Sequence, residues 1–332
     1  MAKCRSAGRR YASRLNVSTL PADQNGRVFP VPLWAAALTL LAVEFALWSW
    51  LANHFYFRQG RVACGAILII ASPLVARALV ALASYFVSRW KGSPVPAAMQ
   101  LGPLSWLRFF AIEWFHLCIQ NLILIPFRGL FHTASERGGS DAQGPLLLLQ
   151  AGYINNGAVW FFTARALERK GFRVFTVDQP AFASIDTMGA LLATRVDEVL
   201  TLTGAKNLTL VAHSMGGLVC RAYLRQFGGT KVAQLVTLGS PHHGTFHACI
   251  ASGPNGLQMR PGNPWLVALG ETKVAVPFTS IFSVHDTVIS PQESSRMPEA
   301  VNIQISGVGH VSMPSGKAAR RTLLSVLERA HS

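Results

Sequence analysis

Two patterns of apolar residues divide the chain. Long, nearly uncharged runs occupy Val31–Asn53 and Val62–Ser88, with Glu44 and Arg77 as their single charged residues. Each run is long enough for a helix that crosses a bilayer, which needs about 20 apolar residues. From Leu146 onward, short apolar runs alternate with helical periodicities. The chain therefore predicts a membrane region followed by a mixed α/β domain.

The C-terminal part predicts alternating strands and helices. The expected strands are short and continuously apolar, as strands of a parallel sheet buried between two helical layers are. The strands are Leu146–Gln150, Phe172–Asp178, Asn207–His213, Val232–Leu238, Thr279–Val284 and Asn302–Ser306, and the helices lie near Ala158–Lys170, Thr187–Thr203, Met215–Phe227 and Gly316–Ala330. The expected fold class is α/β, a mainly parallel sheet with helices on both faces.

The two long runs are interpreted as membrane spans that the chain retains. The first run lies too far from Met1 for a signal peptide, and the aromatic residues near its ends are typical of the membrane interface. Two buried helices of a soluble domain are the alternative. If the runs pair as a hairpin, Glu44 and Arg77 meet inside it and have a structural role.

A third apolar stretch, Leu104–Phe127, has a different pattern. At about 100° per residue, its polar residues fall mostly on one side, and they are Arg108, Glu113, His116, Gln120 and Asn121. We expect an amphipathic helix that lies in the membrane surface rather than across it. A third span is the alternative.

The chain divides into four expected parts. They are a basic N-terminal segment 1–30, a membrane region 31–131, a linker 132–145 of small and polar residues, and the α/β domain 146–332. The membrane region contains the spans 31–53 and 62–88 and the amphipathic helix 104–127.

Lys and Arg precede the first span and follow the second. The positive-inside bias therefore places the N-terminus in the cytoplasm. Two spans return the α/β domain to the same side, whereas three would export it.

Composition and charge agree with a membrane protein. Of the residues, 50% are hydrophobic and 14% charged, and the mean hydropathy is +0.32, whereas soluble domains carry about 25% charged residues. The net charge is +15, and residues 1–140 hold 14 Lys and Arg against 4 Asp and Glu. Because this basic part is also the apolar part, we expect no nucleic-acid partner. Five scattered cysteines without a C-x-x-C pair predict neither a disulfide framework nor a structural zinc site.

Ser214 lies at the most informative point of the sequence. The segment LTLVAHSMGGLVCRAYL places it between an expected strand and a helix, after Ala212 and His213 and before Gly216 and Gly217. This is the G-x-S-x-G nucleophile elbow with Ala212 in place of the first glycine. Small residues are needed because the turn is tight, and the helix N-terminus favours negative charge that develops at the serine. An ordinary serine in a Gly-containing loop is the alternative.

A serine hydroxyl needs a histidine that removes its proton and an acid that orients the histidine. Among the acidic residues after Ser214, only Asp286 directly follows an expected strand, and a turn-capping Asp is its alternative reading. His310 lies in a Gly-flanked loop just past the last strand. The other candidates after Ser214 are His242, His243, His247, His285 and His331.

The segments AHSMGG and VTLGSPHHGT resemble the bacterial lipases of the α/β-hydrolase fold, and most closely the small lid-poor lipases whose elbow also begins with Ala. The resemblance covers about Leu146–Arg329 and leaves out the N-terminal 140 residues. It implies Ser214 as the nucleophile, Asp286 in FTSIFSVHDTVISP as the acid and His310 in ISGVGHVSM as the base.

The resemblance also implies an oxyanion hole made of the backbone N–H groups of Met215 and Tyr153. Similar lipases have His-Gly in the loop after the first strand, and here Ala151 replaces that histidine before Gly152. This departure leaves the shape of the loop open, and loss of one such donor costs about a hundredfold in rate or more.

The apolar runs and the resemblance together imply a membrane-anchored serine hydrolase that cleaves carboxylic esters, a lipase or esterase of the bacterial inner membrane with a lipid or ester substrate. The resemblance implies neither a metal nor an organic cofactor, and the oligomeric state is open. The alternatives are an acyltransferase or thioesterase with the same triad, or an inactive membrane scaffold of the same fold. Residues Phe246–Pro277, with a short helix at NPWLVAL, form either a lid or a connection.

Overall fold

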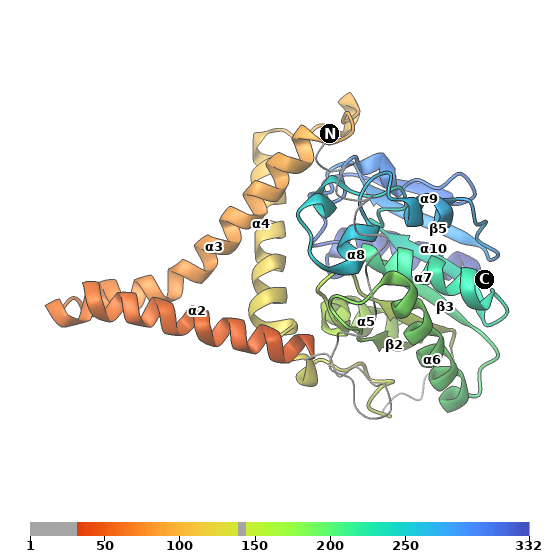
Figure 1. The fold of residues 1–332 in the computed structure, drawn as a ribbon, viewed down its shortest axis with the longest axis horizontal. Helices are drawn as coiled ribbons and strands as arrows, with labels where there is room; N and C mark the ends of the chain where they lie inside the picture. Colours follow the sequence, from red (N-terminus) through yellow and green to blue (C-terminus); the bar gives the residue numbers. More distant parts are fainter. Residues whose placement is uncertain (1–31, 139–143, 332) are drawn as a thin grey trace.

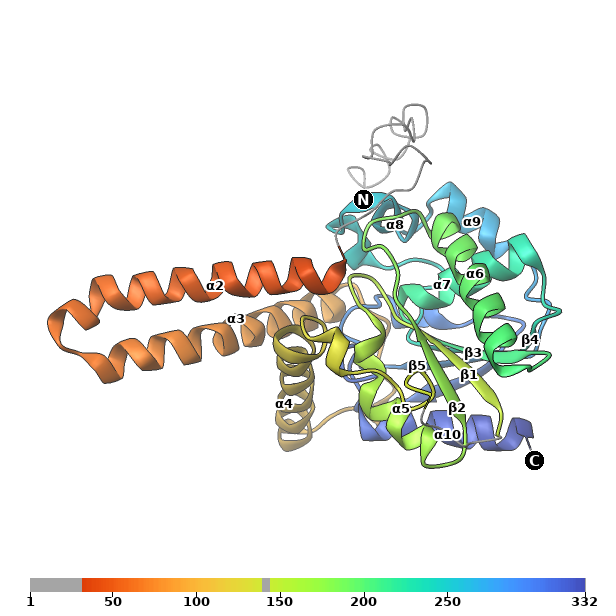
Figure 2. The same cartoon turned by 90° about the horizontal axis from the view of Figure 1, so that it is seen from below.

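The computed structural model describes residues 32–138 and 144–331 (Figure 1). The expected basic segment 1–30 lies outside the described residues, as do residues 139–143 of the expected linker. Within the described residues, a long helical hairpin extends from an α/β domain, and a third helix lies between them (Figures 1 and 2).

A parallel six-stranded sheet forms the centre of the α/β domain. The strand order is β2-β1-β3-β4-β5-β6, and every neighbouring pair is parallel. The strands are β1 (Leu146–Gln150), β2 (Arg173–Val177), β3 (Leu208–His213), β4 (Val232–Leu238), β5 (Phe278–Ser283) and β6 (Val301–Ile305). They agree with the expected strands to within about one residue at each end, which confirms the predicted α/β class.

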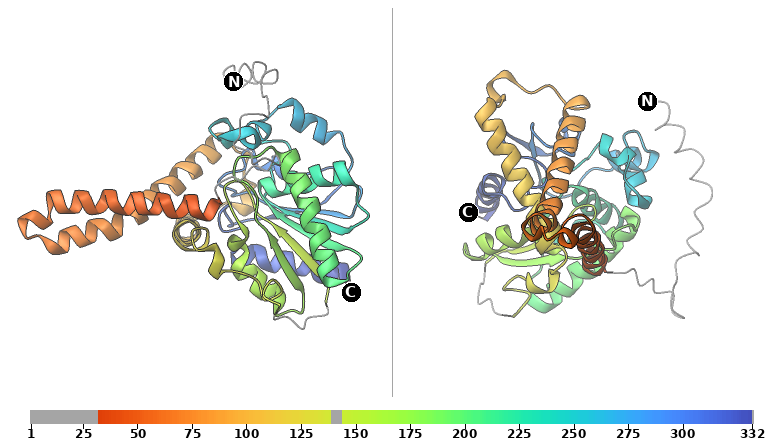
Figure 3. Two further views of the ribbon diagram at one scale, coloured as in Figure 1. Left: turned by 60° about the horizontal axis from the view of Figure 1, so that its bottom comes forward. Right: turned by 90° about the vertical axis from the view of Figure 1, so that its left-hand side faces the viewer.

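Helices cover both faces of this sheet, as its continuously apolar strands predict (Figures 2 and 3). The helices are α5 (Phe161–Glu168), α6 (Ile185–Thr203), α7 (Met215–Phe227), α8 (Gly253–Gln258), α9 (Pro264–Gly270) and α10 (Lys317–His331). Short 3₁₀ turns span Phe57–Gln59, Ala97–Met99, Arg128–Leu130, Gly157–Trp160, Phe246–Cys249 and Gln292–Ser295.

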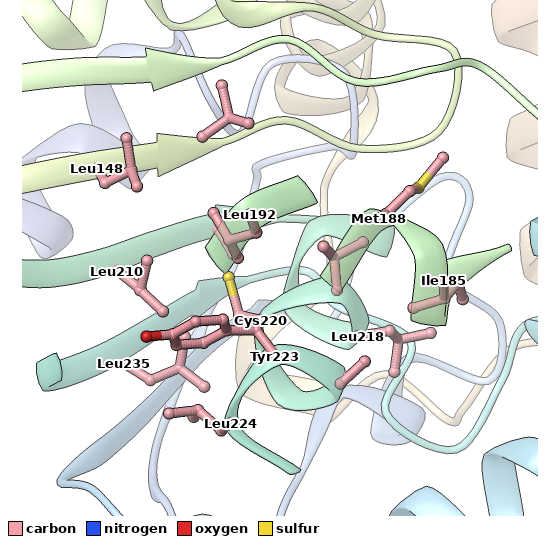
Figure 4. Close-up of a cluster of buried hydrophobic side chains, with 14 of the residues drawn as sticks. Leu148, Ile185, Met188, Leu192, Leu210, Leu218, Cys220, Tyr223, Leu224 and Leu235 are labelled. Carbon is pink, nitrogen blue, oxygen red and sulfur yellow. The ribbon is translucent and has the colours of Figure 1, made fainter. Parts of the chain in front are cut away.

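Successive strand residues alternate between two apolar cores. Leu148 and Leu210 pack with α6 and α7 (Figure 4), whereas Leu147 and Leu149 pack on the other face with Trp160 and the residues of α5 and α10. All five of these side chains are fully buried. The sheet therefore lies between two apolar layers.

The expected membrane region contains the helices α2 (Leu33–Phe55), α3 (Val62–Trp90) and α4 (Pro103–Ile119), and α4 continues as the π-helical turn η4 (Gln120–Leu124). Helices α2 and α3 form the hairpin that projects away from the sheet, and α4 runs crosswise to α2 beside the α/β domain (Figures 1 and 2). By length and composition, three helices of the described residues are apolar enough to cross a membrane: α2, α3 and α4 with η4.

Helix α4 and η4 bury two polar residues against the α/β domain. Glu113 and Gln120 are buried there together with Phe109, whereas Leu104, Leu107 and Phe115 are exposed. Arg108 is exposed as well. Buried polar and exposed apolar side chains are not typical of a helix on a water-soluble domain, which turns its apolar side inward.

The chain between η4 and β1 is attached to the edge strand β2. The Thr133 hydroxyl donates to the Val174 carbonyl (2.7 Å), and Glu136 Oε1 accepts from the Thr176 N–H (2.8 Å). The first residues of the Gly-rich stretch at 132–138 are thus hydrogen-bonded to the sheet.

The single charges of the two long runs meet within the hairpin. Arg77 Nη1 lies 2.5 Å from Glu44 Oε1, and the same nitrogen donates to the Pro73 carbonyl (3.3 Å). This confirms the pairing that a hairpin implies, and it lets each charge neutralise the other in an apolar region.

Replacement of only one partner should destabilise the hairpin, because the other charge then has no partner in an apolar environment. We expect Glu44→Leu or Arg77→Leu to lower the free energy of unfolding in detergent micelles by roughly 3 kcal/mol. The double variant should recover most of this loss, and Thr39→Val, at an exposed position of α2, should be neutral. A double variant that is no more stable than either single variant would contradict a structural role for the pair.

Candidate active site

Ser214 occupies a tight turn between β3 and α7. Its backbone has φ 57° and ψ −132°, a region that side chains rarely adopt. The Ser214 N–H donates to the Leu238 carbonyl (3.0 Å), which fixes the turn against β4. A Cβ at Gly216 would lie 2.7 Å from the Ala151 carbonyl oxygen, and one at Gly217 would overlap the Ser240 side chain. The small residues of the motif are therefore required by the strand ends that crowd the turn.

The structure brings Ser214, His310 and Asp286 into one hydrogen-bonded chain. Ser214 Oγ lies 2.9 Å from His310 Nε2, and His310 Nδ1 lies 2.9 Å from Asp286 Oδ2. With the proton on Nδ1, the imidazole donates to the carboxylate and accepts from the serine hydroxyl. Ser214, His310 and Asp286 are 7%, 6% and 2% exposed. The arrangement can transfer the serine proton to the histidine.

Asp286 performs two tasks with its two carboxylate oxygens. Oδ1 accepts from the N–H groups of Val288 (2.8 Å) and Ile289 (2.7 Å), which is the turn-capping role that the sequence left open. Oδ2 accepts from His310. The cap therefore fixes the carboxylate, and this orients the second oxygen toward the imidazole.

His213 supports the loop that carries His310. Its Nε2 lies 3.1 Å from the His310 carbonyl oxygen, and the two rings are 4.6 Å apart. Burial is the main cause that holds the pKa of His213 well below its ordinary value, and the nearby His310 lowers it further. A neutral His213 donates to the His310 carbonyl through its Nε2–H. His213 precedes Ser214 in the elbow, so this bond joins the elbow to the loop that carries His310.

The loop after β1 lies against Ser214, where the second oxyanion donor is expected. A Cβ at Gly152 would lie 2.7 Å from the Ser214 Cβ, so only glycine fits there. The Tyr153 hydroxyl donates to the Ser252 carbonyl (2.8 Å), and Ile154 has φ 48°. The expected first donor, Met215, opens α7, where a backbone N–H has no partner within the helix.

Other histidines near the site have structural partners. His242 Nε2 lies 3.1 Å from Thr237 Oγ1, and His243 Nδ1 lies 3.1 Å from the Ser294 carbonyl oxygen. His285 Nδ1 accepts from the Gly307 N–H (3.1 Å), and burial lowers the pKa of His285 to about 4. Among the described residues, no group of three or more His, Cys, Asp and Glu is arranged to hold a metal ion.

Two residues beside His310 were not singled out from the sequence as part of the site. Thr287 Oγ1 accepts from the His310 N–H (3.3 Å) and donates to Glu113 Oε2 (3.3 Å). The only signal for Glu113 was a carboxylate within an apolar helix that lies about 200 residues before His310 in the sequence.

The segment between β4 and β5 is anchored to the rest of the domain. Helix α9 confirms the short helix expected at NPWLVAL, and its residues Leu266 and Leu269 are buried. Arg221 Nη2 donates to the Leu269 carbonyl (2.9 Å), and Asn255 Nδ2 donates to the Ala181 carbonyl (2.8 Å). These contacts attach the segment to α7 and to the loop after β2.

Known proteins resemble the α/β domain of this chain. Residues 145–267 match the family described as alpha/beta hydrolase fold. A triacylglycerol lipase of Vibrio cholerae is 28% identical over 126 residues, which are 37% of this chain and 40% of that protein. A triacylglycerol lipase of Pseudarthrobacter phenanthrenivorans is 34% identical over 89 residues, 26% of this chain and 28% of that protein. The chain thus spans well under half the length of each of these relatives.

Solved structures show the same fold. The mature lipase BlEst2 of Bacillus licheniformis has a TM-score of 0.52 and 16% identity, over 57% of this chain and 94% of that chain. Lipase B of Aspergillus fumigatus has a TM-score of 0.51 and 16% identity, over 59% and 54% of the two chains. The α/β domain therefore has the α/β-hydrolase fold, and the curated relatives confirm its similarity to lipases and esterases.

The contact between Gly152 and Ser214 can be tested with Gly152→Ala. The added methyl group would displace the loop after β1 or the serine, so we expect kcat/KM for a short-chain ester to fall roughly a hundredfold. Gly270→Ala is the matched control, because a Cβ there meets open space, and it should change kcat/KM less than about twofold. Equal activities of the two variants would mean that this loop does not approach the serine.

Proposed function

We propose that the protein is a membrane-anchored serine hydrolase that cleaves carboxylic esters through an acyl-enzyme. The observation that carries this proposal is the buried chain of two 2.9 Å hydrogen bonds from Ser214 through His310 to Asp286. The position of Ser214 at a strand-to-helix elbow supports it, because the turn presents the hydroxyl at the end of the sheet.

In the proposed mechanism, His310 Nε2 takes the proton of Ser214 as Oγ attacks the ester carbonyl. The backbone N–H groups of Met215 and Tyr153 stabilise the resulting oxyanion. His310 then gives the proton to the leaving alcohol, and it later activates the water that releases the acid. Asp286 holds the imidazole in the required tautomer and stabilises its charged form.

Apolar side chains beside the oxyanion loop support an acyl substrate. Ile154, Phe182 and Ile250 are 39%, 50% and 85% exposed. Phe182 packs edge-on against Tyr153, and the Tyr153 hydroxyl is bonded to Ser252, two residues after Ile250. Apolar side chains exposed near a reactive serine favour binding of a hydrocarbon chain. The names of the curated relatives favour a fatty-acid ester.

Membrane anchoring through α2 and α3, with α4 in the membrane surface, fits the exposed surfaces. Both helices of the hairpin expose large apolar side chains along their length, namely Leu40, Val43, Phe45, Leu47, Trp50, Val62, Ile67, Ile70, Val75, Leu79, Val80 and Phe86. A surface of this size would not be stable in water. Helix α4 lies crosswise to α2 (Figures 1 and 2) and exposes the apolar residues Leu104, Leu107, Ile112 and Phe115, which favours two spans and an in-plane helix over three spans.

The assignment of the triad is tested by ester hydrolysis in purified protein. Ser214→Ala and His310→Ala should each lower kcat by roughly 10⁴-fold or more, because the nucleophile or its base is lost. Ser325→Ala, in α10, is the control and should retain activity. A folded Ser214→Ala variant with kcat within tenfold of the unmodified protein would rule out Ser214 as the nucleophile.

The expected topology is tested by reporters fused after Ser332. With two spans and a cytoplasmic N-terminus, a fluorescent protein that matures only in the cytoplasm should fluoresce, and a phosphatase that is active only after export should be inactive. The opposite pair of results would mean an exported hydrolase domain and would favour α4 as a third span.

A further inference from the structure

We propose that Glu113 of α4 is a positioning residue for the loop that carries His310. This inference rests on the proposed function of Ser214, His310 and Asp286. It makes a helix of the membrane region part of the active centre, although the resemblance to lipases leaves that region out.

Glu113 binds the backbone directly after His310. Its Oε2 accepts from the Val311 N–H (3.0 Å) and its Oε1 accepts from the Ser312 N–H (2.9 Å). The Thr287 hydroxyl donates to Oε2 as well (3.3 Å). The side chain is almost completely buried. Three donors and no acceptor face the carboxyl group. Burial is the largest effect on this group and raises its pKa, and the hydrogen bonds from Ser312 and Val311 act in the opposite direction.

The loop depends on these bonds because it contains no regular secondary structure. Residues 310–315 form turns between β6 and α10. The N–H groups of Met313 and Ser315 bond to carbonyl groups within these turns, whereas those of Val311 and Ser312 bond to Glu113. Glu113 gives the N–H groups of Val311 and Ser312 hydrogen-bond acceptors in a buried place where water does not supply them. Gly309 provides the space for the carboxyl group, since a Cβ at this position would overlap Glu113. Gly309 therefore lets the Glu113 side chain of α4 approach the backbone next to His310.

Thr287 connects the acid loop with the histidine loop at the same point. It follows Asp286 directly, and its hydroxyl oxygen accepts from the His310 N–H (3.3 Å) while its proton goes to Glu113. A displacement of Glu113 would thus affect the loop of the acid and the loop of the base together.

Further contacts hold α4 in this position. Gln120 Nε2 donates to the Val311 carbonyl (2.8 Å), and His116 Nδ1 lies 2.8 Å from Ser315 Oγ. Trp114 Nε1 donates to the Leu74 carbonyl (2.8 Å) and so joins α4 to α3. The helix is therefore attached on one side to the catalytic loop and on the other side to the hairpin.

The hairpin also reaches the acid loop through its own end. Arg89 Nη1 donates to the Val284 carbonyl (3.3 Å), and the Ser93 N–H donates to Gln292 Oε1 (2.7 Å). Gln292 Nε2 in turn donates to the Asp286 carbonyl (3.0 Å). Residues of the expected membrane region therefore form hydrogen bonds with both the loop that carries His310 and the segment that carries Asp286.

Because Glu113 acts through the backbone and not on substrate, its loss should lower kcat and leave KM unchanged. A fall in kcat at constant KM is the result that separates positioning of the loop from a contact with substrate.

The test uses Glu113→Gln in the full chain, with active sites counted by a fluorophosphonate label so that kcat is expressed per reactive serine. Gln keeps the size of the side chain but turns an amide N–H₂ toward one of the two backbone donors. We expect kcat per labelled site to fall roughly tenfold to a hundredfold, with KM within about twofold. Arg108→Gln, at an exposed position of the same helix, should leave both values unchanged.

The outcomes separate this inference from the proposed function. If the unmodified protein neither labels nor hydrolyses esters, the proposed function fails. If it is active and Glu113→Gln has the same kcat per labelled site, only the role of Glu113 is wrong. Fewer labelled sites with a normal kcat per site would mean that Glu113 only stabilises the fold, which also overturns the inference. If Glu113→Gln yields no labelled protein, Thr287→Val decides, because it breaks the link between Glu113 and His310; an unchanged kcat per site would then overturn the inference.

Discussion

The turn at Ser214 is the constraint on which the proposed active centre depends. A backbone with φ 57° and ψ −132° is costly for any side chain, by roughly 1–3 kcal/mol, and it persists because its surroundings hold it in place. The sheet supplies one anchor through the Leu238 carbonyl. The loops after β1 and β4 leave no room for side chains at Gly216 and Gly217. These contacts keep the Ser214 backbone in one conformation, and this conformation directs the hydroxyl toward His310.

The ends of parallel strands supply the other active-site groups. Parallel strands direct their carboxyl ends to the same edge of a sheet, so the loops after β1, β3, β5 and β6 meet there. Asp286 follows β5, and its cap fixes the carboxylate before it meets His310. The loop with His310 has bonds of its own, such as that from the Met313 N–H to the His310 carbonyl, but the N–H groups of Val311 and Ser312 are satisfied by Glu113 of α4.

This dependence explains the unusual orientation of α4. Helix α4 and η4 place Glu113 and Gln120 against the α/β domain, and α4 exposes the apolar residues Leu104, Leu107 and Phe115. These exposed residues suit lipid rather than water. One helix therefore satisfies two requirements, because its polar side completes the histidine loop and its apolar side suits a membrane. The hydrolase domain and the proposed anchor are joined through hydrogen bonds and not only through a connecting chain.

Local patterns in the sequence were sufficient to predict the strands, the main helices and the elements that carry Ser214, Asp286 and His310. The signals were apolar runs of strand length, the spacing of small residues around the serine, and the position of acid and histidine just after strands. The partnership of Glu113 with Val311 and Ser312 could not be predicted, because the residues lie about 200 positions apart and α4 is outside the resemblance. The left-handed backbone of Ile154 and the docking of Thr133 and Glu136 on β2 likewise depend on tertiary contacts.

The central claim, an activated serine at Ser214, is tested most directly by mapping a covalent adduct. The membrane fraction would be treated with a fluorophosphonate, digested, and analysed by mass spectrometry for the peptide that carries the phosphonyl group. The account predicts one modified peptide, with the group on Ser214, and no adduct after prior treatment with a competing ester-like inhibitor. A fully folded protein that remains unmodified, or that is modified at another serine, would contradict it.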